Sequence, residues 1–241
     1  MILTPIEIIM ATFSLIIVTI FSLVGISIAL KYRNTNDKVY LLVGLTWIGI
    51  IEAWVPSGIV LIGSIITNSL ILSKESFLII AIAGYPLSTF IWITAIAEIL
   101  YWDKKKLIQI IFGVGGAIYE IVFLSVLFTD VSLIAAFKSP VDVSYQPIVS
   151  VYILIALIII LLTGLIISIN SIKDNIPQNK LRGYFLLAAL TTLFIGGLLD
   201  AAADLDLLGI VLVRLFVISS AIEFYFAFVM PNFIKRIFKI S

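Results

Sequence analysis

Long apolar segments recur along the whole chain, and they constrain its fold more than any other feature. A membrane-spanning helix needs roughly 20 consecutive apolar residues. The chain is 62% hydrophobic and 12% charged, which leaves too little polar surface to cover a water-soluble globule. We therefore expect residues 1–230 to form an all-α, polytopic membrane helical bundle of seven transmembrane helices. The expected spans are about 5–30, 39–62, 77–101, 107–129, 147–171, 183–202 and 208–230.

The second span is ambiguous. The apolar stretch 40–72 is longer than one span, and Pro56-Ser57-Gly58 within it could divide it into two helices, giving eight in all. The distribution of basic residues decides between the two, because cytoplasmic loops carry an excess of Lys and Arg. An eighth helix would put the first basic cluster on the opposite side from the others. We therefore expect one helix that kinks or ends near Pro56, followed by an outer connection at 63–76.

Four basic clusters fall on one side of the membrane when seven spans are assumed. Only Lys74 and Lys138 fall on the other side, and Arg214 lies within a span. The N-terminus is then outside and the C-terminus is cytosolic, and we expect a multi-pass protein of the cell membrane. The four clusters are Lys31, Arg33 and Lys38; Lys104, Lys105 and Lys106; Lys173, Lys180 and Arg182; and Lys235, Arg236 and Lys239.

The connections between the spans are short, and the longest is an outer loop at about 130–146. Residues 231–241 are a short amphipathic basic segment, in which Phe233 and Ile237 face one way and Lys235 and Arg236 the other. This pattern suits a helix that lies at the cytosolic interface of the bilayer. We expect the basic inner face to receive a cytosolic partner, because the chain shows no output domain. The net charge of +1 gives no argument for nucleic acid.

The chain contains no His and no Cys. Their absence excludes a Ser-His dyad, a His-ligated haem, the usual catalytic zinc site and thiolate chemistry. No other motif in the sequence names a reaction. We therefore expect no enzyme, no catalytic residues, no metal site and no cofactor.

Ionisable side chains within the spans are the strongest functional signal, because each costs several kcal/mol in hydrocarbon unless it is paired or hydrated. At a rise of about 1.5 Å per residue, Glu52, Glu120, Asp200 and Arg214 all fall in the outer half of the bilayer. Arg214 is the one Arg inside a span, so we expect it to pair with at least one of the three acids. A polar cluster of these four residues predicts a ligand-binding pocket; the alternative is a structural ion pair between helices.

Two further acids, Glu98 and Glu223, lie nearer the cytosolic face. The sequence places no embedded base at their depth. Both are candidate proton sites, and the alternative is a carboxyl group that is hydrogen-bonded to a neighbouring helix. For Glu98, the shallower of the two, an alternative is a side chain that extends to the interface.

These features favour a receptor-like or sensory protein that binds a small ligand in its outer half. The alternative is a small secondary transporter, proton-coupled, with 3+1+3 helix repeats. This alternative is based on the acidic residues that lie at two levels in the membrane, and on a sequence similarity between residues 40–46 and 185–191. A structural or assembly subunit is a third hypothesis. The bilayer and an unidentified small ligand or substrate are the expected partners.

Seven spans with an external N-terminus resemble, in topology alone, the microbial rhodopsins, the G-protein-coupled receptors and the small sugar transporters with 3+1+3 repeats. A rhodopsin requires a Lys in the middle of its seventh helix for the retinal Schiff base, and residues 208–223 contain none. The Pro-Gln signature of the sugar transporters is also missing from the spans, since Pro177-Gln178 lies in a connection. The likeness therefore assigns no family.

Overall fold

The structure is a computed structural model that describes residues 2–202 and 205–240. Helices make up 82% of it, and the remainder includes one two-stranded sheet. The helices are α1 (Pro5–Leu30), α2 (Tyr32–Thr35), α3 (Lys38–Gly49), α4 (Val55–Thr67), α5 (Lys74–Ile82), α6 (Tyr85–Leu100), α7 (Lys105–Thr129), α8 (Pro147–Ile172), α9 (Pro177–Ala202), α10 (Leu207–Val229) and α11 (Asn232–Ile237). Short 3-10 turns span Glu52–Trp54, Trp102–Lys104 and Val131–Leu133, and the strands are β1 (Ala135–Ser139) and β2 (Asp142–Tyr145).

Seven candidate spans are present among the described residues. Each is a single helix, or consecutive helical segments, long and apolar enough to cross a membrane. The expected helical bundle with seven such helices is confirmed. Most bounds agree with the predicted spans within a few residues. The clearest difference is α9, which begins at Pro177 rather than near residue 183, because polar residues extend the helix beyond its apolar part.

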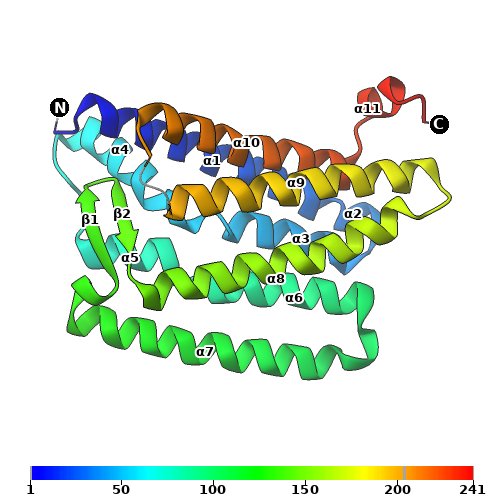
Figure 1. Cartoon of the computed structure of the whole chain (residues 1–241), viewed down its shortest axis with the longest axis horizontal. Coiled ribbons are helices and arrows are strands. Elements are labelled where there is room, and N and C mark those ends of the chain that lie inside the picture. Colours follow the sequence, from blue (N-terminus) through cyan, green and yellow to red (C-terminus); the bar gives the residue numbers. More distant parts are fainter. Residues whose placement is uncertain (1, 203–204, 241) are drawn as a thin grey trace.

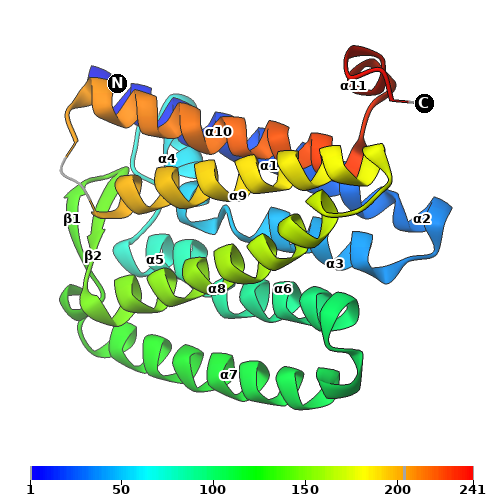
Figure 2. The same cartoon turned by 45° about the vertical axis from the view of Figure 1, so that its right-hand side comes forward.

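Six of the seven spans close into a ring, and the fourth lies outside it. Around the ring, α1 packs against α3 and α4, α3 against α6, α6 against α8, α8 against α9, α9 against α10, and α10 against α1. Helix α7 packs mainly on α6 and lies at the edge of the bundle (Figures 1 and 2). Most of the α7 surface is therefore exposed, and its buried residues are Phe123 and Leu127.

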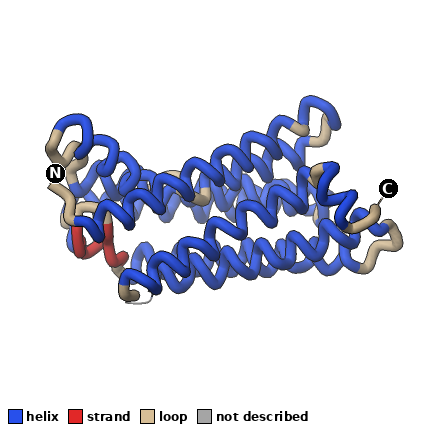
Figure 3. The backbone as a smooth tube through the Cα atoms, turned by 90° about the horizontal axis from the view of Figure 1, so that it is seen from above, coloured by secondary structure: helices blue, strands red, loops and turns tan. Residues whose placement is uncertain are grey.

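The two ends of the bundle differ in character, and the view from above shows them at opposite ends of the helices (Figure 3). The N-terminus and the β1–β2 hairpin lie at one end, called here the hairpin end (Figure 1). The α1–α3, α6–α7 and α8–α9 connections and α11 lie at the other, the basic end. All four basic clusters belong to these segments, so the fold gathers them at one end.

The second span is broken just before Pro56. Helix α3 ends at Gly49, a 3-10 turn follows, and Pro56 stands in the first turn of α4. The predicted kink is therefore present, and its cause is that proline lacks an N–H and clashes with the carbonyl four residues earlier. The predicted outer connection at 63–76 is wrong. A proline is tolerated at a helix start, so α4 continues to Thr67 and the connection covers only residues 68–73.

The third span contains a second break, which the sequence interpretation missed. Helix α5 ends at Ile82 and α6 begins at Tyr85, with Pro86 in its first turn. The Gly84-Tyr85-Pro86 motif is a recognisable signal for such a break. The two breaks are neighbours, because the turn at Glu52–Trp54 packs against α5.

The segment at 130–146, predicted to be a loop, contains the antiparallel β1–β2 hairpin. Phe137 pairs with Val143, and an irregularity lies between Phe137 and Ser139. Ser57 of α4 donates a hydrogen bond of 2.8 Å to the Val141 carbonyl and ties the turn of the hairpin to the second span. The chain is still all-helical in class, with 82% of it in helices, and this one small sheet is an addition that the sequence did not predict.

A layer of stacked aromatic rings fills the centre of the bundle. The Trp47 ring lies between Phe21, at 5.4 Å between ring centroids, and Phe224, at 3.5 Å. All three side chains are fully buried. This aromatic layer joins α1, α3 and α10 through apolar contacts, with aromatic stacking adding to the burial of their surface.

Candidate functional site

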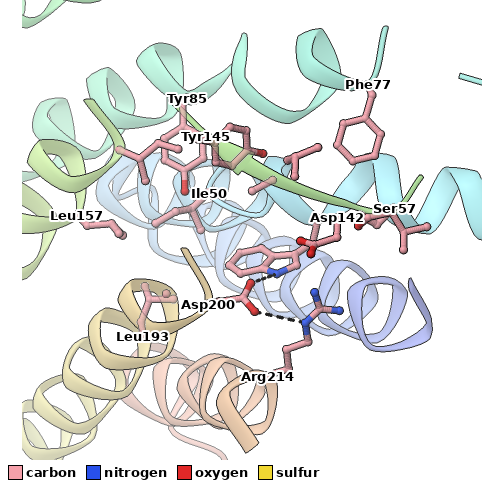
Figure 4. A pocket seen from close by; sticks show the side chains of 16 residues that line it. Ile50, Ser57, Phe77, Tyr85, Asp142, Tyr145, Leu157, Leu193, Asp200 and Arg214 are labelled. Atoms are coloured by element: carbon pink, nitrogen blue, oxygen red, sulfur yellow. Dashed lines mark hydrogen bonds and ion pairs between the residues drawn. The ribbon is translucent and has the colours of Figure 1, made fainter. Parts of the chain in front are cut away.

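A cavity of about 80 Å³ lies between the hairpin and the helices at the hairpin end. Figure 4 shows its lining side chains converging from the second, third, fifth, sixth and seventh spans and from β2. Its polar side chains include Ser57, Tyr85, Asp142, Tyr145, Asp200 and Arg214. Its apolar walls include Ile50, Phe77, Ile153, Leu157 and Leu193.

Arg214 and Asp200 form an ion pair at the base of this cavity. Arg214 Nε lies 3.4 Å from Asp200 Oδ1, and the Arg214 side chain is almost fully buried. The other carboxylate oxygen, Asp200 Oδ2, accepts a hydrogen bond of 3.0 Å from the Trp54 indole N–H (Figure 4). The predicted pairing of Arg214 with at least one of the three outer acids is thus confirmed for Asp200.

Arg214 also anchors the seventh span to the first. Its Nη1 donates hydrogen bonds to the Met10 carbonyl and, at 3.1 Å, to the Ser14 hydroxyl, both on α1. A buried guanidinium therefore has partners on two neighbouring helices, α1 and α9. Removing one partner of such a buried pair is costly, because the remaining charge stays in a medium of low dielectric constant.

Asp142 enters the cavity from β2, and the sequence interpretation did not identify it. Burial raises the pKa of the Asp142 carboxyl above its usual range; the charges of Lys138 and Arg214 oppose this shift and that of Asp200 adds to it. The residue belongs to a segment predicted to be an external loop, where a carboxylate is normally solvated. Only the folding of the hairpin back over the helices brings it to Asp200 and Arg214.

Two tyrosine hydroxyls face the cavity. Tyr85 is only 4% exposed, and Figure 4 shows its hydroxyl and that of Tyr145 directed into the cavity. Neither hydroxyl forms a hydrogen bond with another of the described residues. Tyr85 occupies the first position of α6, so the break before it is what directs this side chain inward.

Glu52 and Glu120 do not join the Arg214 pair, which corrects the expectation of one four-residue cluster. Glu52 lies in the turn that breaks the second span, and its carboxylate accepts a hydrogen bond from the Gly84 backbone N–H. A Cβ on Gly84 would come within 1.8 Å of Glu52 Oε1, so only glycine permits this approach. The second oxygen of Glu52 and one oxygen of Glu120 are buried without a hydrogen-bond partner among the described residues.

Glu120 projects from α7 beside a groove of about 280 Å³ between α6 and α7. Pro86, Gly113 and Gly116 also line this groove. The Glu120 carboxylate is close enough to Glu52 for their charges to interact. The predicted outer polar layer therefore divides into the Asp200–Arg214 pair, which Asp142 joins at the cavity, and the Glu52–Glu120 pair beside the breaks.

Glu98 and Glu223 lie apart from the cavity and from each other. Lys105, at the start of α7, reaches back to form a salt bridge with Glu98. Lys105 belongs to a basic cluster at the end of the span and is not an embedded base, so the Glu98 side chain is directed toward the interface, the alternative given for it. Glu223 accepts a hydrogen bond of 2.8 Å from the Thr192 hydroxyl on α9. The buried face of α10 carries Arg214, Val217 and other residues but not Glu223, which lies on the flank of the helix.

Comparison of the chain with protein-family models, with curated proteins and with solved structures found no match. The geometry of the cavity is therefore the basis for a function. Its shape and chemistry suit recognition: a small polar space, a buried ion pair that is already satisfied, and polar groups on the hairpin and on α6 that still have hydrogen-bonding capacity.

Proposed function

We propose that this chain is a receptor-like, sensory seven-helix protein of the cell membrane that binds a small ligand in the cavity beneath the β1–β2 hairpin. The hairpin end faces outward and the basic end faces the cytosol, in keeping with the excess of Lys and Arg at the basic end. The hairpin then covers the ligand from the external side, and the basic end meets a cytosolic partner.

The observation that carries this proposal is the closed layer of the bundle next to the cavity. Ile50 lines the cavity, and Trp47, about one helical turn further along α3, is fully buried between Phe21 and Phe224. Leu190 is likewise buried one turn beyond Leu193, which lines the cavity. A cavity that ends on packed rings supports ligand recognition, because these rings separate it from the opposite side of the bundle.

The position of Glu223 also favours a receptor over the proton-coupled transporter with 3+1+3 repeats. A proton carrier would be expected to communicate with the ligand cavity, but Glu223 lies on the flank of α10 with Thr192 as its partner. The breaks at Glu52–Trp54 and Ala83–Gly84 have no counterpart in the continuous helices α9 and α10, so the two halves of the chain differ in detail.

Signal transfer has a structural basis in the residues that line the cavity. Trp54 belongs to the break in the second span and Tyr85 to the break in the third, while Arg214 links α10 to α1. A ligand that contacts these residues acts on segments where the helix is already interrupted. Such points absorb changes in backbone angles more readily than a continuous helix does.

The test is to fill the cavity. Gly197 lines it, and a Cβ at this position would have only Leu157 Cδ1 near it, at 3.9 Å, so Gly197→Leu projects into the free space. Gly115→Leu is the matched control, because a Cβ on Gly115 meets nothing within 4 Å. Thermal unfolding of the full chain in detergent is measured with ethylammonium, acetate and acetamide, which have similar sizes and different charges.

At least one of these probes is expected to raise the unfolding midpoint of the wild type and of Gly115→Leu, with no effect on Gly197→Leu. A set of probes that never stabilises the wild type, or that stabilises Gly197→Leu equally, refutes a ligand in this cavity. Uptake of the stabilising probe into proteoliposomes, abolished by Glu223→Gln, would establish the transporter instead.

A further inference from the structure

The charges and walls of the cavity narrow the chemical class of its ligand. Resting on the proposed function, we propose that the cavity binds a small alkylammonium cation, held by the Asp142 carboxylate against the rings of Trp54, Tyr85 and Tyr145.

The balance of charge favours a cation. Asp200 and Arg214 neutralise each other directly, and the remaining Arg214 hydrogen bonds go to the Met10 carbonyl and Ser14. Asp142 forms no salt bridge within the part of the chain that the structure describes. Its carboxylate accepts a hydrogen bond from the Val143 backbone N–H and interacts with the charge of Lys138. Among the described residues it has no ion-pair partner, so an ammonium group is its natural complement.

The walls favour an organic cation over a metal ion. The faces of Trp54, Tyr85 and Tyr145 attract a cation through their electron-rich rings. The free hydroxyl oxygens of the two tyrosines accept hydrogen bonds from ammonium N–H groups. Hard metal cations require about six oxygen ligands, and the hydrocarbon side chains of Ile50 and Leu193 supply none.

The volume of the cavity limits the size of this cation. About 80 Å³ corresponds to two or three water molecules at roughly 30 Å³ each. A protonated amine with one or two carbon atoms fits this space. A larger amine requires the hairpin to move, because β2 supplies Asp142 and Tyr145 on that side of the cavity.

Ligand binding is expected to be coupled to a proton. The pKa of Asp142 is raised by burial, with Arg214 and Lys138 acting against the rise and Asp200 adding to it. An ammonium ion bound at Asp142 favours the ionised carboxylate, so binding displaces its proton. The affinity for ethylammonium should therefore fall as the pH is lowered through the pKa of Asp142 in the free protein.

The experiment measures binding of ethylammonium chloride to the full chain in detergent by calorimetry, from pH 5 to 8. N-Methylglucamine chloride, whose cation is too large for the cavity, keeps the ionic strength constant. Asp142→Asn keeps the shape of the side chain and removes its charge. Asp130→Asn makes the same change at an exposed position of the same segment and serves as the control.

We expect saturable ethylammonium binding that weakens at low pH and is lowered about tenfold or more by Asp142→Asn, with Asp130→Asn like the wild type. Equal binding by wild type and Asp142→Asn overturns the proposal. If acetate or acetamide stabilises the protein and ethylammonium does not bind, the proposal of a cationic ligand is refuted, while the proposal of a ligand in this cavity stands. If potassium chloride competes fully with ethylammonium at equal concentration, the proposal that the cavity selects an organic cation over a metal ion is refuted. No binding by any probe refutes both proposals.

Discussion

Asp142 lies on a strand at the hairpin end, yet its carboxylate is half-buried near the Asp200–Arg214 pair. The charges of Lys138 and Arg214 lower the pKa of Asp142, and that of Asp200 raises it. Burial of the carboxyl group away from solvent has the largest effect, so the pKa of Asp142 is raised. A carboxyl group in this situation opposes folding when it is ionised. A buried carboxyl group with a raised pKa is typical of functional sites. This agrees with the proposed role of Asp142 in ligand recognition, since the group does not favour stability.

Asp142→Asn should stabilise the ligand-free protein at neutral pH. Because the folded-state pKa of Asp142 lies above its unfolded value, its favourable contribution is fully present below the unfolded pKa and is lost as the pH rises through the folded pKa. Asparagine carries no charge and avoids this loss. The unfolding midpoint of the variant should exceed that of the wild type at pH 7, and the difference should shrink toward pH 4. A variant that is less stable than wild type at pH 7 would show that the charge is needed.

Gly84→Ala should displace the Glu52 carboxylate from the break in the third span. The added Cβ would meet Glu52 Oε1 at 1.8 Å and the carboxyl carbon at 2.5 Å, so the hydrogen bond to the Gly84 N–H is lost. We expect a loss of about 1–3 kcal/mol in unfolding free energy. In a Glu52→Ala background the same change should cost less, and strictly additive effects would contradict the contact. Gly115→Ala, in open space, is the control.

The breaks in the second and third spans have the same design and contact each other. Each has a proline in the first turn after it, and the Glu52 side chain of one break contacts the backbone of the other at Gly84. The hairpin is a third element, tied to α4 by the Ser57 hydrogen bond and to α5 by the edge-to-face contact of Phe77 with Phe137. The cavity exists because these three elements meet.

Ser57→Ala should loosen the hairpin without disturbing the spans. It removes a buried hydrogen bond of 2.8 Å and leaves the Val141 carbonyl without this partner, a loss of about 1–3 kcal/mol. Amide hydrogen exchange of a peptide covering 135–145 should become faster, while peptides from α9 and α10 remain unchanged. Ser125→Ala, which removes a hydrogen bond within exposed α7, is the control. Unchanged exchange in the hairpin would show that other contacts hold it.

The molecule as a whole has two chemically distinct ends, joined by a bundle with an aromatic centre. The hairpin end carries the cavity, and the basic end carries the four clusters of Lys and Arg. Because the seven spans alternate in direction, one orientation in the membrane places all four basic clusters on the cytosolic side.

Reporter tags test this orientation directly. Tags inserted at 34–36, 104–106 and 175–179 should all report the cytosol, and a tag at 135–145 should report the exterior. The reason is that the first three sites lie beside basic clusters and the fourth lies in the hairpin. Opposite results for 34–36 and 104–106 would support eight spans in place of seven.

The sequence alone determined the number of spans, their approximate bounds and the presence of ionisable groups inside them. These are local properties: a helix in hydrocarbon satisfies its own backbone hydrogen bonds, so a long apolar run is sufficient to identify it. The kink near Pro56 was predictable for the same reason, since proline acts on its own helix. The Gly84-Tyr85-Pro86 motif carries the same local signal for the break before Pro86.

Only the tertiary structure decided which charges meet. Asp200 pairs with Arg214 and Glu98 with Lys105, whereas Glu52 and Glu120 lie together elsewhere. Depth in the membrane follows from counting residues along a helix, but the direction in which a side chain points depends on how the helices are rotated and packed against one another. The contribution of Asp142 required the hairpin to fold back over the bundle, a long-range arrangement that no local pattern of residues specifies.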